Sequence, residues 1–225
     1  MTAQPFFVGP TDGGMINAVE PWLLPDQAFQ NLFNCYQYRG RVERKYGSSQ
    51  LGRLVNAAGA FQNTPVMGLL TYETSNINQE KLIGFSQTYA NIFNTTGVFT
   101  NISFDTAGAA ITWTGTDSDF FWGWNYSTDA TGNKLLWTTN NVRADRIRYF
   151  NGSLTQGWTI FRPTLNTTAS RHLDTALMIV SYRGRLIFLN TKEADGLTQT
   201  THPQRARWSW IGDPINANAF DDTTT

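Results

Sequence analysis

The chain has 225 residues, and its 17 Lys plus Arg balance its 17 Asp plus Glu, so the formal net charge is zero. This balance removes any global electrostatic argument for binding nucleic acid or an anionic membrane surface. Charged residues make up only 15% of the chain and aromatic residues 14%, with 19 Gly, a composition that favours short strands joined by turns.

Cysteine content and hydropathy set two further limits. The single cysteine, Cys35, cannot form an internal disulfide and is expected to be a small buried apolar side chain. No stretch approaches about 18 consecutive apolar residues, so no membrane span is expected.

Residues 1–20 are predicted to form an extended arm, because Pro and Gly recur along them without a helical or strand period. The arm carries one apolar run, Phe6-Phe7-Val8, that is suited to docking. Two interpretations are open: the arm packs on its own domain, or it reaches a neighbouring subunit.

Residues 22–54 form the most strongly patterned stretch. Asp26 is a suitable N-cap, and the apolar spacing that follows predicts a short helix over residues 27–34. Alternation around the turn Arg39-Gly40 predicts a hairpin over residues 35–46. Because a helix and a hairpin of this size cannot fold alone, we expect residues 1–65 to be a docking element for the rest of the chain or for a partner.

The hairpin is basic: five Lys and Arg fall within 15 positions from Arg39 to Arg53, opposed by Glu43 alone. They could meet an acidic surface on an adjacent ring or DNA in a channel, or they could be solvated charges that discourage wrong strand pairing. The predicted docking residues combine apolar and basic side chains: Trp22, Leu23, Leu24, Phe29, Arg39, Arg41, Arg44 and Lys45.

From residue 66 the chain repeats every fifty-odd residues, with up to four predicted strands in each unit. The first strands are at residues 66–72, 120–124 and 176–182, the second at 81–83, 134–136 and 185–187, the third at 92–94 and 147–152, and the fourth at 99–102, 158–160 and 208–211. Each second strand begins with a basic residue followed by an aliphatic pair. The third unit is irregular, because residues 206–208 have to serve for both of its last two strands.

Four short strands per repeat predict the blade of a β-propeller, so the expected fold class is all-β, with a β-sandwich as the alternative. Residues 66–225 would hold about three blades, whereas closed propellers have about four to eight. We therefore expect an incomplete propeller that is part of a longer chain. Closure by unrecognised segments, or completion of an open arc by a partner, are the other interpretations.

The segment PWLLPDQAFQNLFNCYQYRGRVERKYG resembles the N-terminal segment of structural proteins from tailed bacteriophages. The matching positions are Pro21, Leu23, Leu24, Pro25, Asn34, Gly40, Arg44, Lys45 and Gly47. The later stretches KLLWTTNNVRADRIRYFNG, YRGRLIFLNT and HPQRARWSWIGDP resemble the same group, so the resemblance spans roughly residues 20–214.

This resemblance implies a virion protein similar to the tail nozzle or hub propellers of short-tailed phages. It implies assembly as a homo-oligomeric ring in the bacterial host cytoplasm, next to other tail proteins, with DNA passing through the lumen without specific binding. No cofactor or metal is implied.

The sequence offers few candidates for chemistry, and we expect no enzyme. His172 and His202 lack the companions of a metal site and are interpreted as surface loop residues. Asp117 and Asp119 are a carboxylate pair that could hydrolyse glycosides or hold calcium, or could be solvated turn residues.

Three hypotheses therefore stand. The first is a structural tail subunit. The second is a glycan-binding propeller for host adhesion, in which Trp122, Trp124 or Trp137 stacks on sugar rings. The third is a glycoside hydrolase that uses Asp117 and Asp119.

Overall fold

The computed structural model describes residues 14–15, 23, 28–29, 35–38, 41–44, 50–74, 80–94, 98–166, 170–216 and 218–222. The chain divides into two compact units, Met1–Gln50 and Leu51–Thr225, so the division precedes the boundary predicted at residue 65. The segment from Leu51 to the first sheet belongs to the second unit because Leu54 and Val55 are buried there.

The described residues of the first unit form two small pairs of strands. Strand β1 (Gly14–Met15) pairs in parallel with β2 (Ala28–Phe29), and β3 (Cys35–Tyr38) pairs in antiparallel fashion with β4 (Arg41–Arg44). The β3–β4 pair confirms the predicted hairpin. The helix predicted over residues 27–34 is wrong at Ala28 and Phe29, whose backbone pairs with β1; its other residues lie outside the described part. A helix of eight residues has little stability of its own, so strand pairing overrides it.

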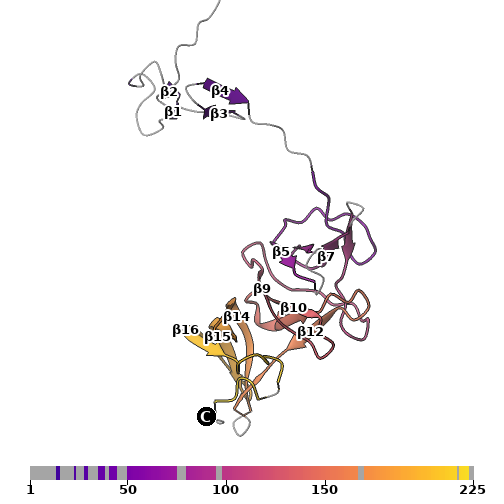
Figure 1. Cartoon of the computed structure of the whole chain (residues 1–225), viewed down its shortest axis with the longest axis vertical. Coiled ribbons are helices and arrows are strands. Elements are labelled where there is room, and N and C mark those ends of the chain that lie inside the picture. Colours follow the sequence, from indigo (N-terminus) through magenta and orange to yellow (C-terminus); the bar gives the residue numbers. More distant parts are fainter. Residues whose placement is uncertain are drawn as a thin grey trace, which may run out of the picture. The chain divides into compact units, whose positions relative to one another are not determined.

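The second unit consists of three four-stranded antiparallel sheets, which confirms the all-β expectation (Figure 1). In each sheet the strands follow one another in chain order. The first sheet is β5 (Gly68–Tyr72), β6 (Lys81–Phe85), β7 (Ala90–Phe93) and β8 (Phe99–Asn101). The second is β9 (Trp122–Thr128), β10 (Lys134–Thr139), β11 (Ile147–Phe150) and β12 (Trp158–Phe161), with the 3-10 turn η2 (Arg143–Asp145) before β11. The third is β13 (Thr164–Asn166), β14 (Arg171–Tyr182), β15 (Arg185–Asp195) and β16 (Thr198–Trp208).

The third sheet departs from the predicted repeat. Its extra strand, β13, precedes the other three, and the strand predicted over residues 208–211 is wrong beyond Trp208, the last residue of β16. Ser209 still pairs with β15, since Ser209 N donates to Leu186 O at 2.9 Å, but Trp210 N donates to Ala219 O at 2.9 Å. The regular pairing ends where the backbone of Trp210 bonds the C-terminal segment.

Two apolar clusters join the three sheets. The first lies between the first and second sheets, and its fully buried members include Ile83, Phe85, Phe150 and Trp158. The second lies between the second and third sheets and includes Leu135, Trp137, Leu186 and Phe188, all fully buried. Each sheet therefore stabilises its neighbour by burying large side chains, as blades of a propeller do.

The first strands of the first and second sheets approach closely at glycines. A Cβ added to Gly68 would lie 2.8 Å from the Cβ of Phe121, and one added to Gly123 would overlap Leu70. These two glycines let β5 and β9 lie next to each other, and no larger residue fits at either position without a shift of its neighbours.

Candidate functional site

The first strand of each repeat lies next to the first strand of the following repeat. Between β5 and β9, Asn125 Nδ2 donates to Thr71 O at 2.7 Å, and Glu73 N donates to Asn125 Oδ1 at 3.2 Å. The side-chain amide of Asn125 on β9 thus bonds backbone groups at the end of β5, so it joins two strands that belong to different sheets.

Two indoles make the corresponding contacts between β9 and β14. Trp122 Nε1 donates to Ile179 O at 2.7 Å, and Trp124 Nε1 donates to Ser181 Oγ at 2.9 Å. The strands β5, β9 and β14 therefore form a continuous row along one side of the three sheets.

This row carries no formal charge. Strand β5 reads GLLTY, β9 reads WGWNYST, and residues 176–182 of β14 read ALMIVSY, without any Asp, Glu, Lys, Arg or His. Trp122, Trp124 and Leu177 are 39%, 40% and 44% exposed. The row is thus an uncharged surface with exposed apolar groups.

The structure separates the three tryptophans that the sequence grouped as candidates for sugar stacking. Trp122 and Trp124 keep part of each ring exposed while their N–H groups are held by β14. Trp137 is fully buried, and its Nε1 donates to Tyr126 O at 2.9 Å. The expectation of an exposed Trp137 is therefore wrong, because this side chain fills the space between the second and third sheets.

Charge is concentrated elsewhere, first around the buried carboxylate of Asp174. A register shift between Leu173 and Thr175 places Asp174 in a β-bulge of β14, with no exposed surface. Arg143 Nη1 lies 2.6 Å and Arg162 Nε 2.9 Å from its oxygens, and Arg146 is a third ion-pair partner. Burial, and then the charges of Arg162 and Arg143, lower the pKa of Arg146.

The second buried carboxylate is Glu193 of β15, whose side chain is 4% exposed. Arg207 donates to both of its oxygens, at 2.9 and 3.0 Å, and Arg205 Nη1 lies at 2.8 Å. Burial alone would raise the pKa of Glu193, but the hydrogen bond from Arg207, its charge, the hydrogen bond from Thr191 and the charge of Arg205 together lower it to about 2. Glu193 is therefore ionised at neutral pH.

Arg143 connects the carboxylate of Asp174 to the backbone of β15 and β16. Besides Asp174, it donates from Nη1 to Glu193 O at 2.8 Å and from Nη2 to Thr200 O at 2.9 Å. One guanidinium thus joins the bulge of β14 to the backbone of the β15–β16 hairpin. The arginines fix the position of this hairpin, and the carboxylates hold the arginines in place.

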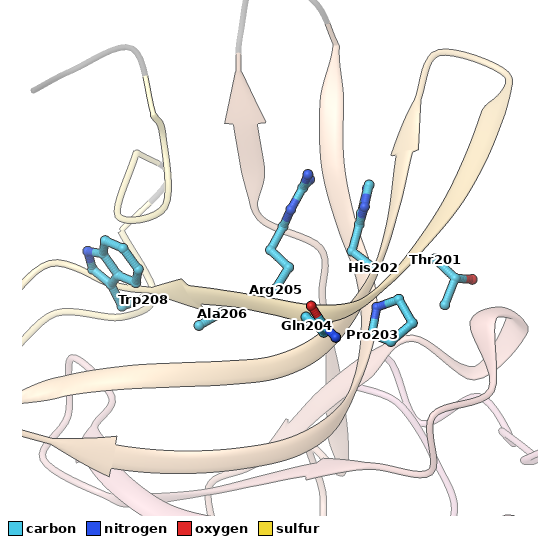
Figure 2. A pocket seen from close by; sticks show the side chains of 7 residues that line it. All are labelled: Thr201, His202, Pro203, Gln204, Arg205, Ala206 and Trp208. Atoms are coloured by element: carbon cyan, nitrogen blue, oxygen red, sulfur yellow. The ribbon is translucent and has the colours of Figure 1, made fainter.

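A groove of about 640 Å³ runs along β16 near the base of this hairpin (Figure 2). His202 and Arg205 project from the same side of the strand, and Trp208 lies at the far end of the groove. The interpretation of His172 and His202 as loop residues is wrong, since they lie on β14 and β16. Among the described residues no group of three His, Cys, Asp or Glu could hold a metal ion.

The carboxylate pair Asp117 and Asp119 serves a turn. Asp119 Oδ2 accepts hydrogen bonds from Thr116 N and Thr116 Oγ1, both at 2.7 Å, and these hydrogen bonds lower the pKa of Asp119. Asp117 accepts a hydrogen bond from Gln87 Nε2. The general acid of a glycosidase needs a raised pKa, so the shift at Asp119 is in the opposite direction.

Half of the predicted docking residues fall within the described chain, all in the first unit. Leu23 is 66% exposed, Phe29 lies on β2, and Arg41 and Arg44 lie on β4, opposite Tyr38 and Cys35 in the register. The other four lie outside the described residues: Trp22, Leu24, Arg39 and Lys45. No pattern in the sequence indicates the roles of Asp174 and Glu193, and the only available signal is the density of arginine between residues 143 and 207.

The sequence and structure were compared with known proteins. No protein-family model, curated protein or solved structure matches this chain. Among the described residues, no helix is long and apolar enough to cross a membrane.

Proposed function

We propose that this chain is a structural component of a bacteriophage tail, a nozzle or hub subunit that assembles in a ring and forms part of the DNA-ejection conduit. The resemblance of residues 20–214 to tail structural proteins suggests the setting. The observation that carries the proposal is the uncharged row formed by the adjacent strands β5 and β9 and by residues 176–182 of β14.

An uncharged wall suits a channel for DNA. Duplex DNA carries about one negative charge per 1.7 Å of its axis, and each phosphate neutralised by Lys or Arg adds salt-dependent affinity. A row of cations would therefore hold DNA in the channel, whereas Leu, Trp, Thr and Ser side chains would let it pass. In this proposal the ionic groups at Asp174 and Glu193 stabilise the subunit, and the first unit docks on adjacent tail proteins in the virion.

The purified chain tests this proposal by light scattering with negative-stain imaging. We expect rings of defined symmetry around an open axis and no measurable affinity for duplex DNA at physiological salt. A compact monomer at all concentrations, or tight salt-sensitive DNA binding, would count against a conduit subunit.

One observation favours a second candidate, a glycan-binding propeller for host adhesion. Trp122 and Trp124 lie two residues apart on β9, partly exposed, with their N–H groups fixed by β14. Immobilised aromatic rings suit stacking on sugars, because little side-chain entropy is lost on binding. A glycan array would show a signal that is lost in Trp122→Ala and Trp124→Ala but kept in the control Trp210→Ala, whose side chain is 41% exposed. No signal on any glycan would remove this candidate.

A further inference from the structure

Each sheet of the second unit uses one face to contact the sheet that follows it. In the first sheet this face carries Leu70, Ile83 and Ile92, which pack in the cluster shared with the second sheet. In the second sheet it carries Trp137 and Tyr149, which pack in the cluster shared with the third sheet. The same contact, from one sheet to the next, therefore occurs twice within the chain.

The third sheet also has such a face. Leu186 and Phe188 are fully buried toward the second sheet. Because side chains alternate along a strand, the register row Val180, Ile187 and Trp208 lies on the opposite face. We call this row the forward face. Trp208 is 58% exposed, and no other sheet of the described chain covers this face.

The first sheet has the complementary end. Its face away from the second sheet is covered at the centre by Leu54, whose Cδ2 lies 2.8 Å from a Cβ placed on Gly84. Leu69 lies beside this cover, with its Cδ2 3.4 Å from the same Cβ position, and is 58% exposed. The segment that carries Leu54 exposes two further apolar side chains: Leu51 (59%) and Phe61 (64%), whose backbone pairs with Val55. We call these three residues the rear end, because exposed apolar groups of this size indicate an interaction surface.

We propose that the forward face of one copy packs against the rear end of a second copy, in a head-to-tail contact that continues the stack of sheets from chain to chain. This inference rests on the proposed ring assembly and names the surfaces that would build it. The occupant is a second copy because the chain makes a sheet-to-sheet contact twice internally and leaves exposed apolar side chains at each outer end of its stack of sheets. A head-to-tail contact is heterologous, and it closes into a ring when the rotation between copies allows.

Trp208 and Leu69 are the residues to test. An exposed tryptophan at the centre of a contact is a frequent hot spot, and its loss weakens association by about thirty-fold or more. A buried, unpaired carboxylate is costlier still, so Trp208→Asp and Leu69→Asp should each abolish self-association of the full chain. Phe120→Asp is the matched control, since Phe120 is 67% exposed and belongs to neither surface.

Mixing the two variants gives the decisive measurement. In sedimentation velocity, each variant alone should be a monomer with an unchanged melting temperature. Their mixture should form a 1:1 complex that grows no further, because Leu69→Asp keeps its forward face and Trp208→Asp keeps its rear end. If Leu69→Asp alone still dimerises, forward faces bind each other and the head-to-tail contact is overturned. A mixture that stays monomeric overturns it too.

The outcomes separate this inference from the proposed function. If the 1:1 complex forms but the unmodified chain makes only open filaments, the head-to-tail contact stands and the conduit ring falls. If the unmodified chain makes rings that survive both substitutions, the ring stands and the contact falls. An unmodified chain that is monomeric at all concentrations overturns both.

Discussion

Two regions of the second unit are stabilised by different kinds of contact. One is the apolar interface between the first and second sheets, and the other is the ionic cluster at the base of the β15–β16 hairpin. Between the first and second sheets the contact is apolar and aromatic: Phe85 and Phe121 stack with centroids 4.2 Å apart, and Trp158 lies 5.6 Å from Phe85. At the base of the β15–β16 hairpin, two buried carboxylates are held by arginines. Apolar burial is insensitive to pH, whereas the ionic base depends on the ionisation of Glu193.

Trp158→Ala is expected to have the largest effect on the apolar contact. This side chain is fully buried and touches Phe85, Phe150 and Trp113, so its removal leaves a large cavity. We expect a loss of about 3–5 kcal/mol in the free energy of unfolding, measured by urea denaturation. The exposed Trp210→Ala should stay close to the unmodified chain, and equal losses from both would mean that the first cluster does not hold the sheets together.

Asp174→Asn tests the ionic base. It leaves Arg143, Arg146 and Arg162 clustered without their shared carboxylate, which should cost about 3 kcal/mol. Urea denaturation measures the change in the free energy of unfolding. The control is Asp195→Asn, which changes an exposed carboxylate at the end of β15. An unchanged stability in Asp174→Asn would show that the three arginines are held by other contacts.

The pH dependence of stability distinguishes the two kinds of contact. The pKa of Glu193 falls from 4.5 to about 2 on folding, so its contribution is complete above pH 4.5 and is lost as the pH falls toward 2. The contribution amounts to about 2–3 kcal/mol. In Glu193→Gln the free energy of unfolding should vary less across this range than in the unmodified chain. Parallel pH profiles for the two proteins would contradict the assignment.

Gly123→Ala should have the smallest effect of the four, about 1–3 kcal/mol, because the added methyl group overlaps Leu70 where β5 and β9 meet. The double variant Gly123→Ala with Leu70→Val should recover part of the loss in thermal denaturation. Gly132→Ala is no control for this test, since its φ of 86° adds backbone strain; Ala130→Gly, on an exposed turn residue, serves better. If the double variant recovers no stability, the loss in Gly123→Ala does not come from the contact with Leu70.

Much of the fold could be predicted because local sequence patterns determine many of its strands. The second strands of the three units were visible from a basic residue before an aliphatic pair, as at Lys81, Lys134 and Arg185, and all three begin at those residues. The β3–β4 hairpin was visible from alternation around Arg39-Gly40. In these elements local pattern and tertiary packing agree.

The wrong predictions concern elements whose structure is determined by contacts between residues far apart in the sequence. The helix predicted over residues 27–34 yields to pairing between Phe29 and Met15, and the strand predicted over residues 208–211 ends early because Trp210 N bonds Ala219 O. Trp137 has the same local surroundings as an exposed tryptophan, and only the neighbouring sheet buries it.

The ionic base could not be predicted for a related reason. Its residues come from η2, the end of β12, a bulge in β14 and two further strands, and a bulge shifts which residues share a face. Nothing near Asp174 or Glu193 in the sequence shows that arginines surround each of these carboxylates.

The bulges at Asp174 and Asn190 divide the third sheet into two halves, and the outer half, toward the β15–β16 turn, ends in residues 195–201, which are all exposed. The outer half, which includes residues 191–202, is attached at its base chiefly by Arg143, Arg205 and Arg207. Segments of this kind open locally without global unfolding, and amide hydrogen exchange detects such opening. Protonation of Glu193 in acid would therefore free the outer hairpin first, so that the subunit would lose its projecting edge while its three sheets stayed stacked.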